Sequence, residues 1–415
     1  MTVFKNAPDV NAAFFQPLAR LAEQAASARP CPELSDDNWI ELGLHRVLEP
    51  AGSGRGFLQE HGPRFEDTPK HSNYFASFQS SRRLALLGEV NAALLETAGF
   101  DDRLGDLPEL RDYEVFALDG HWHRAAAHDP LHNGVKMAVG HCYSLSLRGH
   151  QLRHLLAAEG LHEHDMSMLK RLQPRGLRHG VPKGRRVLIV YDKAGIDFGF
   201  WNRCRKECAI YFLSRPKEGM VFGWLEDRGL DANDSRNAGV TQDAVVLTRD
   251  GTKLRLIQYV EPATGGPYTF LTNDMDLPSG VLAELYRRRW DIEKVFDEIK
   301  NKLHEHKAWG TSPVARSAQA EFVALAHNLL LLYEQRLKRE HGVENTAEDH
   351  RRARRQAELA ELAARAGRPV TPMLLSLRAA TQRSIKFIRW LRQAIRDRLA
   401  EEVAVPRLRQ LYAQL

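Results

Sequence analysis

The stretch YRRRWDIEKVFDEIK, residues 286–300, decides how this chain is interpreted, because it carries two patterns at the period of an α-helix. One pattern is apolar and predicts a helix over 281–302 that lies against a hydrophobic core. Its members are Leu285, Ile292, Val295, Phe296, Ile299 and Leu303.

The second pattern in this stretch is polar. At about 100° per residue, a sector about 60° wide holds Tyr286, Arg289, Glu293 and Lys300. A carboxylate flanked by two cations and a phenol suits metal-assisted phosphoryl transfer, because the acid can bind metal while the donors hold phosphate oxygens. The alternative interpretation is a solvated helix surface with salt bridges.

The spacing Tyr286-x2-Arg289-x3-Glu293-x6-Lys300 resembles the YREK signature of DDE transposases of insertion sequence family four. TNDMDLP at 272–278 and RRWDIE at 288–293 are also typical of that family. The resemblance covers about 113–331 and implies a ribonuclease H-like core in which Glu293 is the third catalytic acid. Tyr286, Arg289 and Lys300 are then expected to hold DNA phosphates near the cut.

Two further catalytic acids are expected at the ends of buried strands, which would hold them rigidly. EVFALDG places Asp119 at the end of an apolar run, and RRVLIVYDKAGID places Asp192 after another. Both resemble the family's first and second catalytic aspartates. Either one alone is more simply a turn residue or a helix cap, and only the combination with the Glu293 helix favours catalysis.

The three acids predict a site for divalent metal. Carboxylate oxygens suit Mg²⁺ or Mn²⁺, and two ions held by Asp119, Asp192 and Glu293 fit phosphoryl-transfer chemistry. His121 and His123 alternate along the same strand, but Mg²⁺ prefers oxygen, so we expect them at a polar strand edge rather than as ligands. Cys204 and Cys208 lack a second cysteine pair, and no structural zinc is expected.

The periodicity along the chain predicts an α/β protein with five parts. A helical amino-terminal region (1–110, with helices at 10–26 and 82–97) is expected to bind DNA ends. The core follows at 111–215, with strands at 113–119, 135–147 and 186–192 and helical material at 154–172. A β-rich insertion at 216–276 precedes the second part of the core at 277–340, which carries the glutamate helix. A helical carboxy-terminal region (341–415) is expected to serve dimerisation or DNA contact.

Charge favours DNA as the partner. Lys and Arg total 59 against 53 Asp and Glu, giving a formal charge of +6 and a pI near 9.1. Basic clusters at 175–186, 203–206 and 351–355 could follow a phosphate backbone, although each alone is as easily a solvated face. Arg203, close in sequence to the segment of the second aspartate, is singled out as a phosphate-binding candidate.

The sequence therefore predicts a transposase that binds its terminal inverted repeats and target DNA, nicks the ends and transfers the strand, as a homodimer when two ends are paired. The alternatives are a ribonuclease H-like nuclease without strand transfer, and a catalytically silent DNA-binding protein of transposase descent. No secretory signal is recognised in 1–20, and the apolar run 322–333 is too short to cross a bilayer, so a cytoplasmic protein is expected.

Overall fold

The structure is a computed structural model that describes residues 9–25, 34–49, 53–64, 70–159, 163–178, 180–231, 233–368 and 383–414. Residues 1–8, part of the stretch on which the expectation of no secretory signal rests, lie outside these ranges. Ala26, the end of the first expected helix, also lies outside them.

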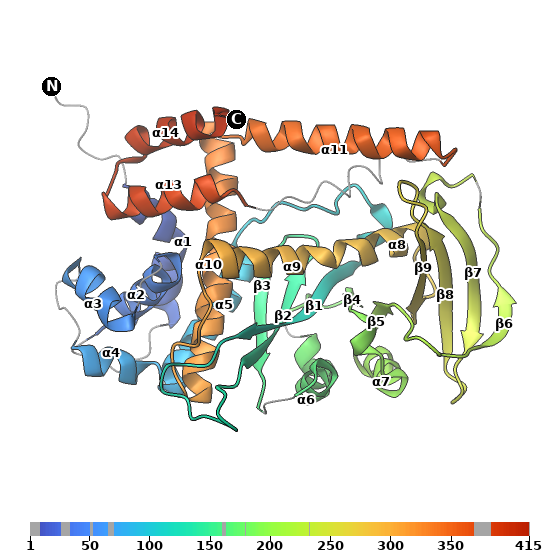
Figure 1. Cartoon of the computed structure of the whole chain (residues 1–415), viewed down its shortest axis with the longest axis horizontal. Helices are drawn as coiled ribbons and strands as arrows, with labels where there is room; N and C mark the ends of the chain where they lie inside the picture. The colour runs from blue at the N-terminus through green and yellow to red at the C-terminus, as the bar shows by residue number, and fades with distance from the viewer. Residues whose placement is uncertain are drawn as a thin grey trace.

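One nine-stranded sheet runs through the molecule in the order β3-β2-β1-β4-β5-β9-β8-β7-β6 (Figure 1). At its centre β1, β4 and β5 are parallel, whereas the neighbouring pairs on both sides are antiparallel. This arrangement confirms the α/β class and the ribonuclease H-like core. The strands are β1 (Tyr113–His123), β2 (Val139–Ser146), β3 (Leu152–Ala157), β4 (Arg186–Val190), β5 (Ile210–Ser214), β6 (Gly223–Asp227), β7 (Val240–Leu247), β8 (Lys253–Val260) and β9 (Pro267–Thr272).

Helices cover both faces of the central strands, and the alternation along β4 explains why. Leu188 and Val190 belong to one core together with α8 (Ser279–Arg288) and α9 (Trp290–Asp297). Val187 and Ile189 belong to a second core with α6 (Asp165–Leu177) and α7 (Phe198–Cys208). Both faces of a parallel strand are therefore buried, as an uninterrupted apolar run predicts.

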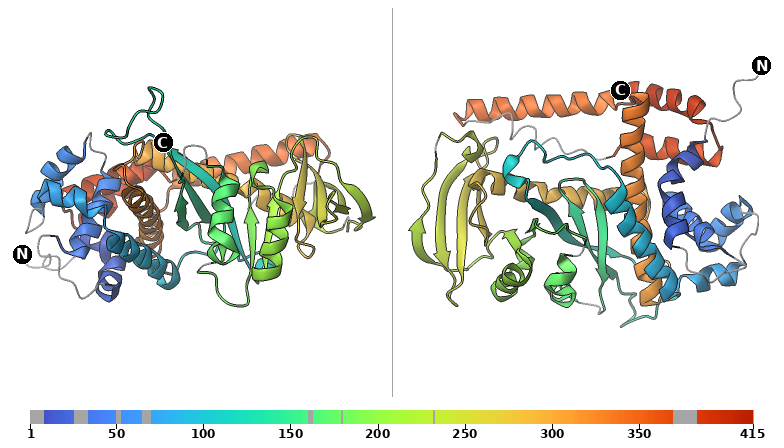
Figure 2. Two further views of the ribbon diagram at one scale, coloured as in Figure 1. Left: turned by 90° about the horizontal axis from the view of Figure 1, so that it is seen from below. Right: turned by 180° about the vertical axis from the view of Figure 1, so that it is seen from behind.

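The remaining helices gather at the β3 end of the sheet, opposite β6–β9 (Figures 1 and 2). The long helix α10 (Pro313–His341) packs on β3, α5 and α2, so this region shares the core of α8 and α9. The other helices here are α1 (Val10–Ala25), α2 (Asp36–Leu48), α3 (Gly54–His61), α4 (His71–Ser77), α5 (Ser81–Thr97), α13 (Ile385–Arg396) and α14 (Glu401–Ala413).

Helix α11 (Thr346–Arg365) extends from the carboxy-terminal helices toward the β6–β9 end (Figure 1). Beyond it, Arg368 donates to the backbone carbonyl of Glu261, in the turn between β8 and β9. The basic run 351–355 lies on this helix and is largely exposed to solvent.

Two local predictions were wrong. The stretch 154–172, expected to be helical, begins inside strand β3, and helix α6 starts only at Asp165. Leu155 and Leu156 fit either period, and pairing with β2 decides in favour of the strand. The strand expected over 135–147 begins later, at Val139.

None of the helices in the described residues combines the length and apolar character that a bilayer crossing requires.

Candidate active site

The parallel pairing of β1 with β4 brings Asp119 and Asp192 to the same edge of the sheet. Ala117 lies opposite Val190, and both aspartates follow two residues later on their strands. Because side chains alternate along a strand, Asp119 shares the face of Val115 and Ala117, and that face lies in the core beneath α8 and α9. The two aspartates therefore point toward the glutamate helix.

The helix that carries Glu293 follows the expected pattern. All six residues of the predicted apolar face, from Leu285 to Leu303, are buried. The helical backbone continues through Arg289, between α8 and α9, and widens into a π-helical turn (Glu298–Lys302) at its end. Helix α9 packs on β1 and β2, so that Glu293 reaches the edge where the aspartates lie.

Arg289 joins the acids. Its guanidinium nitrogens lie 2.8 Å from Glu293 Oε1 and 3.5 Å from Asp119 Oδ2. Burial raises the pKa of Asp119 to about 6; Arg289 and the Gly120 amide oppose this shift, while the charges of Glu293 and Asp192 add to it. The three acids are thus close enough to influence one another, in a setting that disfavours three uncompensated negative charges.

Each aspartate side chain is held by a hydrogen bond from a backbone amide one or two residues later in the chain. Asp119 Oδ1 accepts from the Gly120 amide at 2.8 Å, and Asp192 Oδ1 accepts from the Ala194 amide at 2.8 Å. Ser214 Oγ also donates to the Asp192 carbonyl at 2.7 Å. The cap interpretation of Asp192 therefore holds at one oxygen and is compatible with a further role of the other.

Tyr286 and Lys300 lie on either side of Arg289 and Glu293 along the helix. The Tyr286 ring packs on Phe270, with ring centroids 4.9 Å apart, and burial raises the pKa of its phenol. Asp192 and Arg289 both act electrostatically on that phenol. Lys300 is exposed, and its charge reaches His121, two residues beyond Asp119. Tyr286 thus borders the acids, whereas Lys300 lies close to His121.

Arg203, by contrast, is not brought to the acids by any contact found among the described residues. It lies on α7, on the opposite face of the sheet from α9 (Figure 1), and its guanidinium lies over the Phe200 ring at 5.4 Å. Proximity in sequence to Asp192 was therefore a poor guide to its location.

Two residues that sequence reasoning missed border the site. Asp165, in the first turn of α6, lies so close to β1 that a Cβ at Gly120 would be 2.8 Å from its Oδ1. Burial raises the pKa of Asp165, and the charge of Asp192 adds to this shift. Arg215 follows β5 and acts electrostatically on Tyr286. The wrongly expected helix at 154–172 concealed that Asp165 begins a new helix.

The expected place of His121 and His123 was also wrong, because both are buried rather than at a polar strand edge. The His121 ring packs on Phe296 of α9, with ring centroids 4.8 Å apart. Burial lowers the pKa of His121 to about 3, and the charges of His123 and Lys300 act in the same direction. His121 is therefore neutral and belongs to the packed surface of β1 that the glutamate helix covers.

The donor set at this edge fits a hard divalent cation. Asp119, Asp192 and Glu293 offer only oxygen, and the cost of ionising Asp119 is the kind that a bound cation removes. Arg289 holds two of the carboxylates together in the structure, so a cation would have to share or replace its contacts.

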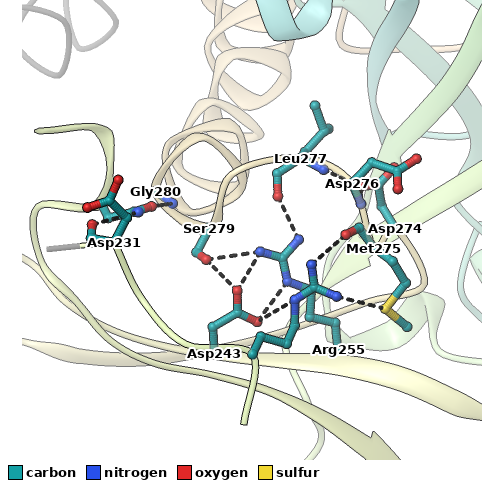
Figure 3. A network of polar contacts seen from close by, with 11 residues as sticks. Asp231, Asp243, Arg255, Asp274, Met275, Asp276, Leu277, Ser279 and Gly280 are labelled. Carbon is teal, nitrogen blue, oxygen red and sulfur yellow. Dashed lines mark hydrogen bonds and ion pairs between the residues drawn. The ribbon is translucent and has the colours of Figure 1, made fainter. Parts of the chain in front are cut away.

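A buried joint fixes the beginning of the glutamate helix on the strands β7 and β8 (Figure 3). Arg255 binds Asp243 with its Nε at 2.7 Å and Nη2 at 2.5 Å, and Ser279, the first residue of α8, donates to Asp243 at 2.6 Å. Next to it, a Cβ on Gly280 would meet the Arg236 carbonyl oxygen at 1.4 Å, so only glycine allows this approach. Strands β6–β9 thereby anchor the helix that presents Glu293.

Comparison with known proteins identifies the family of the chain. The family described as Transposase DDE domain matches residues 116–329, just over half of the chain and a span that includes all three acids. A Sinorhizobium fredii protein named "Putative transposase y4zB" is 31% identical over 148 residues, which are 34% of this chain and 41% of that protein. The chain thus matches less than half of the length of that relative. On the extent of the domain match, the chain belongs to the Transposase DDE domain family.

Proposed function

We propose that this protein is a transposase of the YREK-signature group, which cuts the ends of its insertion sequence and joins them to target DNA. The observation that carries the proposal is the convergence of Asp119, Asp192 and Glu293 from two parallel strands and a helix onto one sheet edge, where Arg289 pairs with Asp119 and Glu293. The family match includes all three acids.

Asp119, Asp192 and Glu293 are the proposed ligands of two Mg²⁺ or Mn²⁺ ions, which when bound polarise the scissile phosphate and lower the pKa of the attacking oxygen. The chain itself provides rigidity: Asp119 lies within strand β1, Asp192 follows the buried strand β4, and Glu293 lies on a helix packed against the same sheet. Such a rigid support costs little reorganisation when charge develops in the transition state.

Arg289, Tyr286 and Lys300 are proposed to hold phosphate oxygens beside the cut. In the free protein Arg289 pairs with Asp119 and Glu293, so its guanidinium already lies among the groups that would surround the scissile phosphate. Planar, bidentate donors suit phosphate. The Tyr286 hydroxyl and the exposed Lys300 ammonium would extend this contact on both sides.

Longer contacts with DNA are assigned to positive surfaces outside the acid site. The exposed run 351–355 on α11 and the basic residue Arg203 on α7 are the proposed phosphate contacts. The amino-terminal helices are the proposed end-recognition module and the carboxy-terminal helices a surface for dimerisation or DNA contact, because pairing two ends requires two active sites.

The test is cleavage of labelled DNA that carries the element's inverted repeats, with Mg²⁺, Mn²⁺ or EDTA, by the wild-type protein and by Glu293→Gln. We expect metal-dependent nicking at the ends that is lost in Glu293→Gln, while the DNA-binding affinity of the variant stays near that of wild type. Equal nicking by both proteins would remove Glu293 from the site and overturn the proposal.

A second assay supplies pre-cut ends and a target plasmid. Strand-transfer products that depend on the three acids are expected of a transposase, whereas nicking without any joined product would identify a nuclease. Specific DNA binding without either reaction would identify a catalytically silent relative.

A further inference from the structure

A compact group of metal-ligating side chains lies in the amino-terminal helices, far along the chain from the three acids. His45 and Glu49 are one helical turn apart at the end of α2, and His61 ends α3. One ligand atom from each residue lies within 4.8 Å of the other two, and all three residues are buried. Within the described ranges no other three such residues, the three acids included, have ligand atoms all within this distance.

The distances inside this group suit ligands arranged around an ion. His45 Nδ1 lies 3.6 Å from Glu49 Oε1, and His61 Nε2 lies 3.6 Å from Glu49 Oε2. Ligand atoms about 2.0–2.1 Å from a tetrahedral zinc ion are about 3.3 Å apart, so small side-chain movements would close the set. Moreover, His45 Nδ1 is buried and makes no hydrogen bond.

The second nitrogen of His45 strengthens this interpretation. His45 Nε2 lies 3.5 Å from Glu41 Oε1, one turn earlier on the same helix. Metal-binding histidines usually donate the other ring N–H to a carboxylate, which fixes the tautomer and aims the free nitrogen at the metal. Glu41 stands where such a partner is required, and Glu41 in turn accepts from Asn11 at 3.4 Å.

Aromatic contacts hold both imidazole rings in place. The Phe57 ring stacks on His61 with centroids 4.6 Å apart, and Phe15 packs on His45 at 5.3 Å. The surroundings are therefore apolar on one side and carboxylate on the other. Such an apolar shell limits the access of solvent to a bound metal ion.

We propose that His45, Glu49 and His61 bind a zinc ion that joins the end of α2 to the end of α3. Two imidazoles and one carboxylate match the ligand preference of Zn²⁺, whereas Mg²⁺ and Ca²⁺ prefer oxygen alone. Three protein donors leave one tetrahedral position for a water molecule. The site is separate from the one proposed for Mg²⁺ and does not depend on the proposed function.

The competing occupant of this group is a proton. Burial lowers the pKa of His45, but Glu41 and Glu49 together raise it above its ordinary value, so a buried imidazolium between two glutamates is the alternative. Arg396 also faces Glu49, with Nη2 3.4 Å from Oε2, but its side chain is 63% exposed and can move away. Zinc and proton cannot both occupy His45 Nδ1, which makes the two states experimentally distinct.

The first experiment measures metal in the untagged full-length protein, purified without chelators and passed through metal-free buffer. Mass spectrometry of the metal is expected to find about one zinc ion per chain. Replacement by Co²⁺ should produce the visible absorption of a four-coordinate ion, and one equivalent of Zn²⁺ should abolish it. Removing zinc with a chelator should lower the melting temperature, and zinc should restore it.

The zinc content of single variants distinguishes the proposed ligands from residues that do not bind the metal. His45→Asn and Glu49→Gln should lose zinc, and Glu41→Gln should keep the fold but bind zinc about 10- to 100-fold more weakly, because it removes only the partner of His45. His71→Asn, at an exposed histidine of α4, and Glu293→Gln should retain full zinc content. If His45→Asn and Glu49→Gln unfold, the Glu41→Gln affinity and the wild-type Co²⁺ spectrum still decide the proposal.

Protein that remains metal-free after exposure to excess Zn²⁺ would overturn the inference, and so would zinc that persists in both His45→Asn and Glu49→Gln. The imidazolium alternative has its own signature. Because the pKa of His45 is raised in the folded state, its contribution to stability would be present at low pH and lost as pH rises, with no effect of zinc or chelator.

Discussion

Two clusters of carboxylates and arginine in this protein use the same residue types for different purposes. In the buried joint of Figure 3, Asp243 and Arg255 are 5% and 2% exposed, and Ser279 and the Leu277 carbonyl complete their hydrogen bonds. At the sheet edge, Arg289 faces Asp119 and Glu293, whose side chains stay 23% and 30% exposed, and the charge of Asp192 acts on Asp119.

The difference lies in the balance of charge. In the joint, Arg255 and the more distant Arg228 compensate the charge of Asp243, and its hydrogen bonds are saturated, so it holds β7 and β8 on α8 and has no capacity for a ligand. The sheet edge has an excess of acid, and the pKa of Asp119 is raised mainly by burial. Perturbed acids that remain accessible are typical of functional sites, whereas saturated pairs are typical of structural ones.

The contrast between the catalytic acids and the buried joint would fail most clearly if the acids at the sheet edge could be replaced without loss of activity. Asp119→Asn and Asp192→Asn should each lower the rate of DNA cleavage by about 10⁴-fold, or about 5 kcal/mol of activation free energy, because each removes a charge that the proposed metal requires. Single-turnover cleavage under saturating DNA measures this loss.

The double variant sharpens this prediction. If the acids act as one unit, Asp119→Asn with Asp192→Asn should be little worse than either single change. Melting temperatures should stay near that of wild type, since Arg289 keeps its pair with Glu293. Losses that multiply, or a fall in cleavage no larger than the fall in folded protein, would count against a shared site.

How far the sequence predicted these clusters depends on the range of the interactions. The apolar face of the glutamate helix and the strands that carry or precede Asp119 and Asp192 follow from local periodicity, which is why they were predicted, although β1 continues past Asp119 to His123. The pairing of β1 with β4 is a long-range contact, and only the motif resemblance suggested that the aspartates would meet.

What the sequence did not reveal depends on tertiary contacts. Asp243 and Arg255 are ordinary charged residues until β7, β8 and α8 bury them together. His45 and Glu49 share a helix turn, but His61 joins them only when α3 folds back. His121 alternates with its neighbours like a polar strand edge, yet α9 covers that face of β1.

The buried joint gives the next largest expected effect, this time on stability. Arg255→Met should lower the free energy of unfolding by about 3–5 kcal/mol, because it removes the buried partner of Asp243 and leaves that charge facing only the partly exposed Arg228 at 3.7 Å. Chemical denaturation followed by circular dichroism measures this change.

Removing both charges provides the control. Arg255→Met combined with Asp243→Leu should recover most of the loss, because apolar residues of similar size replace a buried pair at little cost. Cleavage should fall in Arg255→Met only as far as the folded population falls. A single variant as stable as the wild type would mean that the joint does not fix α8.

Glu305 differs from the acids of both clusters, because it is buried and its hydrogen bonds come from neutral donors. Its effect on stability should therefore depend on pH. Trp309 Nε1 and Gln319 Nε2 donate to its Oε2 at 3.1 and 2.7 Å, and burial raises the pKa of Glu305 to about 7 from its usual 4.5. The folded state therefore binds the proton more tightly than the unfolded state, so stability falls as pH rises from about 4.5 to about 7.

Glu305→Gln imitates the protonated form and should remove this dependence. At pH 8 the variant should be more stable than wild type by up to about 3 kcal/mol, and the difference should shrink toward pH 5. Denaturation curves of both proteins across this range test the sign. A variant that is less stable at pH 8 would show that the carboxylate is stabilised in the fold after all.

Arg203 belongs to neither cluster, and its expected effect is the smallest. It lies over Phe200 on α7, on the opposite face of the sheet from the glutamate helix, so it can contact phosphate without touching the acids. Arg203→Gln should therefore reduce the slope of log affinity against log salt by about 0.9 and leave cleavage at saturating DNA unchanged. Binding titrations at several salt concentrations measure the slope, with Arg289→Gln, which should impair cleavage itself, as the contrast. An unchanged slope would remove Arg203 from the DNA surface. Slower cleavage at saturating DNA would instead mean that α7 also supports the acids. In that case the number of acids near an arginine would not distinguish a catalytic arginine from one that only binds DNA.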